Sequence, residues 1–267
     1  MRLRDALLSL TLLAATAQHA PVFAAEAETP MAAHRASYVL KLATARGADI
    51  TGASGKMGYE IVDACDGWAS RQRLDMTISN RDGQDIQMVS DYATWESKDG
   101  LRMTFRMRQT TEQAVTEQVE GTAELAEAGG KGRVHYTVPE DKTLDLPAGT
   151  LFPMAHTEAI IRAAAAGKKF VALPVFDGTG QKGAQDSSIA IAGWLKPEAS
   201  PYSVLAALPS TRVRIAFFDH DKGDQRPDYE VGMRYWANGI ADDLNMDFGD
   251  FVMQGTLSDL TLPAPHC

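Results

Sequence analysis

The chain has 267 residues, of which 45% are hydrophobic and 23% are charged, which is an ordinary globular composition and excludes collagen-like, coiled-coil and disordered chains. The length is sufficient for a substantial core in one large domain or two small ones. The 26 Lys and Arg against 35 Asp and Glu give a formal net charge of −9, which argues against nucleic acid or an anionic membrane surface as a partner.

The first 24 residues have the three parts of a secretory signal peptide. Arg2 and Arg4 form a basic start, an apolar run follows over residues 6–15, and Val22-Phe23-Ala24 resembles a cleavage site. The alternative is an uncleaved N-terminal helix. The run is shorter than the roughly 20 apolar residues of a membrane span, and no later stretch approaches that length. We therefore expect residues 25–267 to be exported, without a transmembrane span, to the oxidising periplasm of a Gram-negative cell.

After an Ala-, Glu- and Pro-rich stretch over residues 25–34, which we expect to be a loose tail, apolar and polar residues alternate along most of the chain. Leu101, Met103, Phe105 and Met107, for example, alternate with Arg102, Thr104, Arg106 and Arg108. A period of two predicts strands with one dry and one wet face, the antiparallel pattern. Turn signals such as Asn238-Gly239 separate the runs. We predict a mainly β fold, with one domain of about 12–14 antiparallel strands in a curved sheet over residues 25–267.

One segment, at about residues 153–167, departs from this period. Pro153 suits the first turn of a helix, and Gly167 suits the position just after its end. Phe152, Ile160, Ile161 and Ala164 can form an apolar face. We predict one main α-helix here, packed over the mouth or the inner face of the curved sheet.

Cys65 and Cys267 are the two cysteines of the chain. An even pair in an oxidising compartment is typical of a disulfide, and with two cysteines only one intramolecular pairing exists. The alternatives are two free thiols or an intermolecular bridge. Metal binding is disfavoured because neither cysteine has a second cysteine or a histidine at ligand spacing.

Several arginines fall on the wet faces of neighbouring predicted strands. A hairpin register that pairs Arg106 with Glu120 also pairs Arg102 with Glu124, so we favour cross-strand ion pairs. The alternative is a surface for an anionic ligand, such as a lipid headgroup or a peptide carboxylate. The arginines concerned are Arg71, Arg73, Arg102, Arg106 and Arg108.

The sequence also contains 11 methionines, most of them on the predicted strands. Thioether side chains adapt to irregular neighbours, so they fill cores and also line apolar grooves that accept varied ligands. Core filling is the interpretation we favour, and an adaptable groove is the alternative.

We find no sequence motif of a known catalytic or nucleotide-binding site. The run Asp219–Asp224 is rich in carboxylates, but its spacing does not match a calcium-binding loop, and a charged hairpin turn is the simpler interpretation. His156 is a candidate general base, although no Ser or Cys partner follows from the spacing. We expect no catalytic, cofactor or metal site and no enzymatic activity. A hydrolase built from distant residues, such as His156 and an Asp, is the alternative.

A set of short motifs is spread over residues 25–267. They are Cys65, Gly149-Thr150-Leu151-Phe152-Pro153, His156-Thr157, Phe176-Asp177-Gly178, Asn238-Gly239, residues 244–251 and Cys267. On these motifs the chain resembles the EipB family of cell-envelope integrity proteins over most of residues 25–267. The resemblance implies a spiral antiparallel sheet, a periplasmic location, a role in keeping the envelope intact and a shape similar to that of periplasmic lipoprotein carriers. It implies no enzymatic activity, and the paired cysteines of the family map onto Cys65 and Cys267.

These observations predict a non-enzymatic periplasmic protein that supports envelope integrity, is stabilised by an intramolecular disulfide, and binds a protein partner or an extended apolar ligand such as a lipid or a peptide. The alternative is a carrier that holds the acyl chain of a lipid or lipoprotein against the concave face of the sheet. A sealed core under the helix favours a scaffold, whereas an open groove there favours a carrier.

Overall fold

The alternating segments form one antiparallel sheet in the computed structural model, which describes residues 30–47, 49–220, 226–264 and 267. The predicted signal peptide, residues 1–24, lies outside these residues. Within the described residues the sheet has 14 strands, in agreement with the 12–14 predicted. In chain order these are β1 (His34–Ala45), β2 (Ile50–Asp63), β3 (Gly67–Asn80), β4 (Asp85–Ser97), β5 (Arg102–Thr111), β6 (Ala114–Leu125), β7 (Gly132–Val138), β8 (Lys142–Leu146), β9 (Phe170–Val175), β10 (Gln185–Leu195), β11 (Ser210–Asp219), β12 (Tyr229–Trp236), β13 (Ala241–Asp247) and β14 (Phe251–Thr261).

The first strand, β1, lies in the middle of this sheet. The strand order is β8-β7-β6-β5-β4-β3-β2-β1-β14-β13-β12-β11-β10-β9, so that β1 to β8 and β9 to β14 are two meanders. Pairing of β1 with β14, in which Tyr38 lies opposite Leu257, joins the two meanders into one sheet. The edges of the sheet are therefore β8 and β9, which follow one another in the chain on either side of the main helix.

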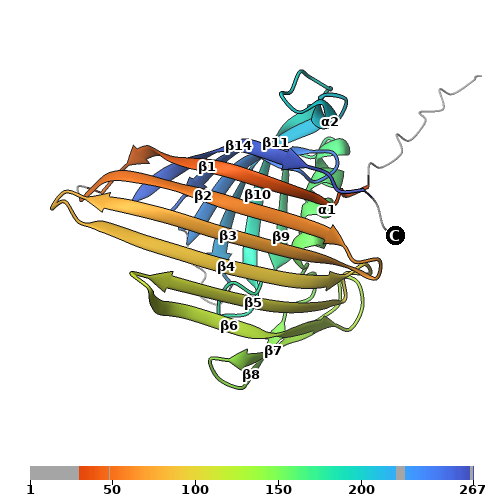
Figure 1. Ribbon diagram of the computed structural model, residues 1–267. Helices are drawn as coiled ribbons and strands as arrows, with labels where there is room; N and C mark the ends of the chain where they lie inside the picture. Colours follow the sequence, from red (N-terminus) through yellow and green to blue (C-terminus); the bar gives the residue numbers. More distant parts are fainter. Residues whose placement is uncertain (1–29, 48, 221–225, 265–266) are drawn as a thin grey trace, which may run out of the picture.

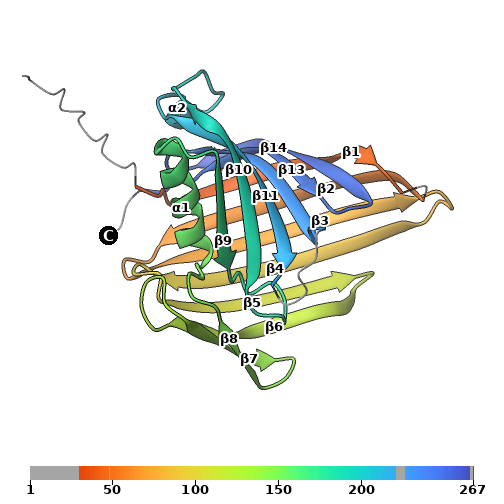
Figure 2. The ribbon, with the colours of Figure 1, turned by 180° about the vertical axis from the view of Figure 1, so that it is seen from behind.

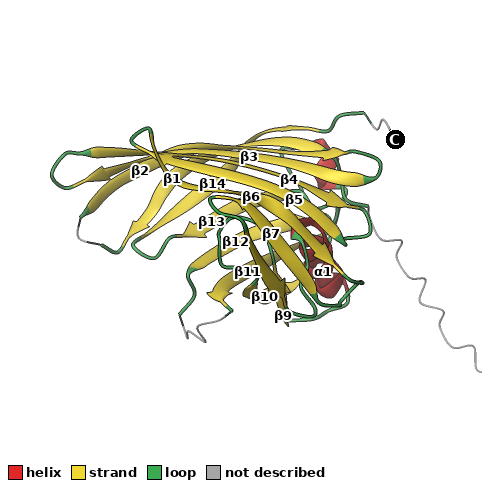
Figure 3. Ribbon diagram, turned by 90° about the horizontal axis from the view of Figure 1, so that it is seen from below, coloured by secondary structure: helices red, strands yellow, loops and turns green. Residues whose placement is uncertain are grey.

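The sheet curves back on itself, so that β9 to β12 lie across from β2 to β5 (Figures 1 and 2). Figure 3 shows the same curvature from below, with α1 at one end of the space between the two walls. Register shifts interrupt the ladder between Ser37 and Tyr38, between Leu42 and Thr44, and between Ile191 and Trp194. Such bulges bend and twist a strand, which a sheet of this size needs in order to curl.

Burial follows the predicted alternation. On β5, Met103, Phe105 and Met107 are buried, whereas Arg102 and Arg106 are exposed. The register predicted for the next hairpin is also confirmed: Arg106 lies opposite Glu120 with Nε 3.1 Å from Oε1, and Arg102 lies opposite Glu124. One face of each long strand therefore points into the molecule and the other into solvent.

The predicted helix is confirmed as α1 (Pro153–Ala165), which contacts β9 and β10. Ile160 and Ala164 are fully buried in a cluster with Ile189, Ile191 and Ile215. A second helix, α2 (Ser203–Ala206), was not predicted and has only four residues. It places Leu205 in the core beside Trp236 and Ile240.

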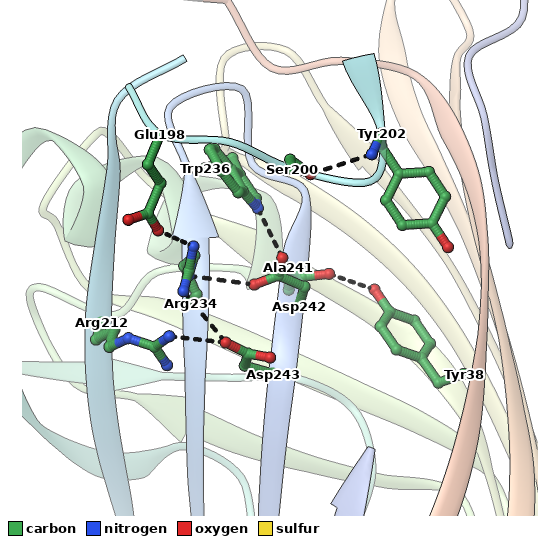
Figure 4. Close-up of polar contacts among 10 residues, drawn as sticks. All are labelled: Tyr38, Glu198, Ser200, Tyr202, Arg212, Arg234, Trp236, Ala241, Asp242 and Asp243. Atoms are coloured by element: carbon green, nitrogen blue, oxygen red, sulfur yellow. Dashed lines mark hydrogen bonds and ion pairs between the residues drawn. The ribbon is translucent and has the colours of Figure 1, made fainter. Parts of the chain in front are cut away.

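A polar network holds the loop before α2 against β12 and β13 (Figure 4). The guanidinium of Arg234 contacts Glu198 from this loop and lies 3.3 Å from the Asp243 carboxylate, which Arg212 also contacts at 2.8 Å. The Trp236 indole donates to Asp242 at 3.1 Å. Burial raises the pKa of Asp242, against this hydrogen bond and the charge of Arg234. This network therefore holds the loop before α2 in place, and these side chains do not line the interior of the curved sheet.

The end of the predicted loose tail, residues 25–34, is ordered in the part that the structure describes. His34 begins β1 and is buried, and the backbone N–H of Ala32 donates to the carbonyl of Asn238 at 2.9 Å. The described end of this segment thus has a hydrogen-bonding partner in the sheet, which its composition did not indicate.

Cys65 and Cys267 form a disulfide, with their Cα atoms 5.4 Å apart. Cys65 lies in the turn between β2 and β3, and Cys267 ends the segment that follows β14. The bridge therefore ties the last residue to the turn of the second hairpin. Because β14 pairs with β1 and β1 pairs with β2, the disulfide reinforces the strand contacts that join the two meanders.

Replacement of Cys267 with Ser should lower the free energy of unfolding under oxidising conditions, because the two cysteines are 202 positions apart and the unfolded chain regains the freedom of that loop. The chain-entropy estimate for such a loop is about 5 kcal/mol as an upper value. Urea unfolding with and without reductant measures the effect. Reductant should bring the unmodified protein down to the Cys267→Ser variant, and equal stability of the two oxidised proteins would contradict the prediction.

Candidate functional site: the lumen of the sheet

The two walls of the curved sheet enclose a lumen of about 610 Å³. One wall consists of inward-facing side chains of β1 to β6, the other of those of β11 to β13, and α1 lies at one end. The volume falls in the range of about 300–1,000 Å³ that is typical of ligand-binding pockets. The concave face is therefore hollow under the helix, which is the arrangement that the sequence analysis associated with a carrier.

Most of the lumen wall is apolar or aromatic, with several methionines. Burial raises the pKa of Tyr59, Tyr92 and Tyr235, so these phenols stay protonated at neutral pH. Of the described residues that line the lumen, none is a Lys or Arg, whereas Glu117, Asp177 and Asp228 are acidic. The lumen therefore suits an apolar, uncharged ligand better than an anionic one. The lining methionines are Met31, Met57, Met107, Met154, Met233 and Met246.

The methionines thus serve both of the roles considered above. Met76, Met103 and Met253 are almost completely buried and fill the core. Six others line the lumen, and four of these, Met57, Met107, Met154 and Met246, also belong to the buried hydrophobic clusters. Flexible, polarisable side chains at that surface can adapt to the shape of a ligand. The direction in which the sheet curves determines which methionines face the lumen, and the sequence does not show that direction.

The turn after β9 closes the gap between the two edge strands. Phe176 packs edge-on against Phe105 of β5, with ring centroids 5.2 Å apart, and also contacts Phe152 just before α1. Gly178 has a φ of +72°, and a Cβ there would lie 2.5 Å from the Phe105 ring, so only glycine fits. Side chains, rather than a continuous hydrogen-bonded ladder, bring the β9 end of the sheet onto the β5–β8 wall.

Two tyrosines hold this turn in place. The phenol of Tyr92 donates to the carbonyl of Asp177, and that of Tyr136 donates to the carbonyl of Gly180 at 3.1 Å. The carboxylate of Asp177 accepts from the backbone N–H of Thr179 at 2.9 Å and from its hydroxyl at 2.8 Å. Burial nevertheless raises the pKa of Asp177. The Phe176-Asp177-Gly178 motif therefore forms part of the lumen wall.

Glu96 of β4 anchors the start of α1. Its two carboxylate oxygens accept hydrogen bonds from the backbone N–H groups of Met154 at 2.8 Å and Ala155 at 3.0 Å, which have no acceptor within the helix. The side chain is 1% exposed. Burial raises its pKa to about 7, although the two hydrogen bonds act in the opposite direction. A carboxylate on a distant strand thus takes the place of a local capping residue, since the residue before the helix is Phe152 and has no side-chain cap.

The sequence analysis did not identify Glu96. Its inward position follows from the alternation of β4, on which Thr94 and Glu96 are both buried and share a face. An acidic residue at a buried position of a strand is a signal that a partner must exist. The sequence around residue 96 does not indicate that this partner is the start of the helix, which begins 57 positions later.

His156 has a serine partner that the spacing did not reveal, Ser187 of β10. His156 Nε2 lies 2.8 Å from Ser187 Oγ, and the serine hydroxyl donates to the carbonyl of Leu173 at 2.7 Å. With its hydrogen given to that carbonyl, Ser187 accepts from the histidine and does not donate to it. This is the reverse of a nucleophile activated by a base. Burial lowers the pKa of His156 to about 4, so the imidazole is neutral, and the pair fastens α1 to the sheet.

The carboxylate-rich run at 219–224 falls partly outside the described residues, which end at His220 and resume at Arg226. Asp219 is buried and contacts Lys182 at 3.0 Å, while His220 contacts Asp186 at 3.0 Å. Among the described residues, no group of three or more His, Cys, Asp or Glu side chains is arranged to hold a metal ion. In the same part of the chain, no helix is both long enough and apolar enough to cross a membrane.

Comparison with known proteins identifies the family. The model of the EipB-like family matches residues 25–263, which is most of the chain. The chain belongs to the EipB-like family. It is 34% identical over 240 residues to the cell envelope integrity protein EipB of Brucella abortus (strain 2308), covering 86% of this chain and 83% of that protein.

A solved structure shows the same fold as this EipB-like chain. It is the crystal structure of a β-barrel-like protein, a domain of unknown function from Brucella abortus. The TM-score is 0.80 at 29% sequence identity, and the match covers 88% of this chain and 99% of the other. The resemblance to the EipB family and the curved antiparallel sheet are therefore confirmed.

The family motifs quoted from the sequence of this EipB-like chain surround the lumen. Phe152 and Phe176 close the gap between the sheet edges, Pro153 and His156 line the lumen from α1, and Gly239 lines it from the turn between β12 and β13. Residues 244–251 supply Leu244, Met246 and Phe248 to the same wall. The motifs thus build a shaped cavity.

Replacement of Glu96 with Gln should change how the stability of the protein depends on pH. The pKa of Glu96 is raised on folding from 4.5 to about 7, so the folded state holds this proton more tightly than the unfolded state. Its contribution to stability is therefore fully present below pH 4.5 and is lost as the pH rises through about 7. The stability of the unmodified protein should fall relative to that of Glu96→Gln over this interval.

Urea unfolding at several pH values measures this difference. Glu124→Gln, which removes an exposed carboxylate from β6, is the matched control, and its stability should run parallel to that of the unmodified protein. Parallel curves for Glu96→Gln as well would refute the effect of burial on this carboxyl group.

Proposed function

We propose that this protein supports the integrity of the bacterial envelope from the periplasm, without catalysis, by binding an extended apolar ligand in its lumen. The lumen carries the proposal, since it is a cavity of about 610 Å³ with largely apolar walls. The predicted signal peptide and the disulfide support an exported, oxidising location. The name of the Brucella abortus relative supports the role in the envelope.

The chemistry of the lumen supports binding rather than catalysis. The buried Ser187 donates to a backbone carbonyl, and the neutral His156 serves as its donor. Glu96 is engaged by two backbone N–H groups. These buried polar groups hold α1 against β4 and β10, and so preserve the shape of the cavity.

A more specific candidate is a carrier for the acyl chain of a lipid or lipoprotein. The methionines that line the lumen and the absence of Lys and Arg from its described lining favour an uncharged hydrocarbon over a free fatty acid, whose carboxylate would face Glu117, Asp177 and Asp228. A protein partner that inserts an extended apolar segment is the other form of the same proposal.

Filling the lumen should weaken binding of an apolar probe. Ser90 lines the lumen from β4, and Ser90→Trp adds an indole there, whereas Val89→Trp adds the same indole on the opposite face of the same strand. Diphenylhexatriene, a neutral dye that fluoresces in apolar sites, should bind the unmodified protein. Ser90→Trp should weaken this binding by about tenfold or more, which corresponds to about 1.4 kcal/mol.

Val89→Trp should keep the affinity of the unmodified protein, and a triacylated lipopeptide should displace the dye if the ligand is an acyl chain. Native mass spectrometry of protein isolated from its own periplasm gives an independent measure, since bound ligand adds a defined mass. Dye binding that is unaffected by Ser90→Trp, together with protein that is isolated empty, would exclude the lumen as the binding site.

Deletion of the gene should sensitise cells to detergents and to antibiotics that act on the cell wall, because the proposed role is in the envelope. Complementation with the unmodified protein should restore growth under these conditions, and complementation with Ser90→Trp should not. An envelope that is unaffected by deletion would refute the proposed role, whatever the lumen binds.

A further inference from the structure

The strands that form one wall of the lumen carry a second, separate groove on their outer face. This groove has a volume of about 620 Å³ and runs across β1 to β5, on the side turned away from β9 to β12 and toward the viewer in Figure 1. Five arginines line it, against two carboxylates, Glu60 and Asp91. A local excess of positive charge is unexpected on a chain whose formal net charge is −9. The arginines are Arg35, Arg71, Arg73, Arg106 and Arg108.

Strand register places four of these arginines around a common centre. Arg71 and Arg106 lie on either side of Ala93 in one row, and Arg73 and Arg108 lie on either side of Asp91 in the next. Strands are about 4.8 Å apart and alternate residues about 7 Å apart, so the four Cα atoms mark a rectangle of roughly 10 by 7 Å. Arginine side chains can span that distance and converge on one bound group.

Two residues at the floor of the groove, next to the arginines, are small. Ala93 contributes only a methyl group between Arg71 and Arg106. Gly58 lies beside Arg73 on β2, and a Cβ there would meet no atom within 4 Å. A ligand can therefore approach the sheet closely between the guanidinium groups.

The carboxylates present do not neutralise all of the arginines. Arg73 pairs with Asp91 at 2.6 Å, Arg35 with Glu60 at 2.6 Å and Arg106 with Glu120 at 3.1 Å. Among the described residues, Arg71 and Arg108 form no ion pair, and both side chains are exposed. Cross-strand pairing, the interpretation favoured from the sequence, thus accounts for only part of the cluster.

We propose that this groove binds a phosphate group, with Arg71 and Arg108 as its principal ligands and Arg73 and Arg106 as flanking donors. One guanidinium can satisfy a single carboxylate by a bidentate pair. A phosphate has more oxygens and more charge, and it accepts hydrogen bonds from several directions at once, as four arginines around a shallow floor provide. The source is either the headgroup of a phospholipid or a soluble phosphate compound.

The groove and the lumen lie on opposite faces of β2 to β4, so each can be tested alone. Inward-facing side chains such as Tyr59 and Tyr92 line the lumen, while their outward neighbours Glu60 and Asp91 line the groove. Substitutions of outward-facing residues therefore change the lining of the groove without replacing a side chain that points into the lumen.

The test uses two variants in the full mature protein. In the first, Arg71→Gln and Arg108→Gln are combined, which removes two charges at the unpaired positions. Its matched control combines Arg81→Gln and Arg162→Gln, which removes two charges from exposed sites on a turn and on α1. Ala93→Glu places a carboxylate between Arg71 and Arg106 and should compete with the ligand from within the groove.

Calorimetric titration with inorganic pyrophosphate tests the soluble source, and cosedimentation with phosphatidylglycerol vesicles tests the headgroup, with phosphatidylcholine vesicles as the comparison. We expect the unmodified protein to bind at least one of the two anionic probes, more weakly as salt is added. The Arg71/Arg108 variant and Ala93→Glu should lose about tenfold or more in affinity, because charge-assisted hydrogen bonds are removed or neutralised. The Arg81/Arg162 control should stay within about twofold, as expected for exposed charges away from the groove.

Binding of pyrophosphate without sedimentation assigns a soluble phosphate, and preferential sedimentation with phosphatidylglycerol assigns a headgroup. Either result supports the proposal if the variants behave as expected. The proposal is overturned if the unmodified protein binds neither probe, if the control variant loses as much affinity as the Arg71/Arg108 variant, or if the groove binds poly-glutamate but no phosphate. Thermal unfolding of each variant confirms that it is folded before its affinity is compared.

Discussion

The pairing of the first strand with the last decides the architecture of this protein. β1 and β14 lie more than 200 positions apart in the chain, and their ladder joins two meanders that would otherwise be separate sheets. Bringing such distant segments together costs loop-closure entropy. The disulfide between Cys65 and Cys267 lowers that cost by restricting the unfolded chain, and it acts beside the contact that needs it. The curvature, the lumen and both of its walls depend on this single junction.

The lumen is bounded where the two edges of the sheet meet, through side chains and an isolated bridge of Leu151 with Val175 rather than through a continuous ladder. β8 and β9 do not pair with each other as strands. Phe152 and Phe176 fill the gap with aromatic contacts, and α1 crosses one end. A fully closed ladder would fix the width of the interior. With packed side chains at the closure, the sizes of a few residues determine that width. Glu96 and the pair of His156 with Ser187 then hold α1, so that three buried polar groups far apart in sequence keep the cavity from collapsing.

The same strands serve two chemically different surfaces. On β2 to β4, one set of alternate residues faces a lumen whose described lining has no Lys or Arg, and the other set faces a groove rich in arginine. A period of two makes this separation possible without additional elements, since neighbouring side chains lie on opposite faces. An apolar ligand and a phosphate group would therefore be kept apart by the thickness of one sheet.

The sequence by itself determined the elements whose cause is local. Alternation predicted the strands, and opposite charges favoured the register of Arg106 with Glu120. The break in that alternation predicted the helix that begins at Pro153, and two cysteines in an exported chain left one intramolecular pairing. Tertiary structure alone decided which face is concave, that Glu96 meets the start of α1, and that Arg71 and Arg108 stay unpaired while Arg73 finds Asp91. The physical reason is that these three features depend on contacts between strands and loops that are distant in the chain. A period of two shows that the two faces of a strand differ in polarity, but it does not show which residues each face will contact.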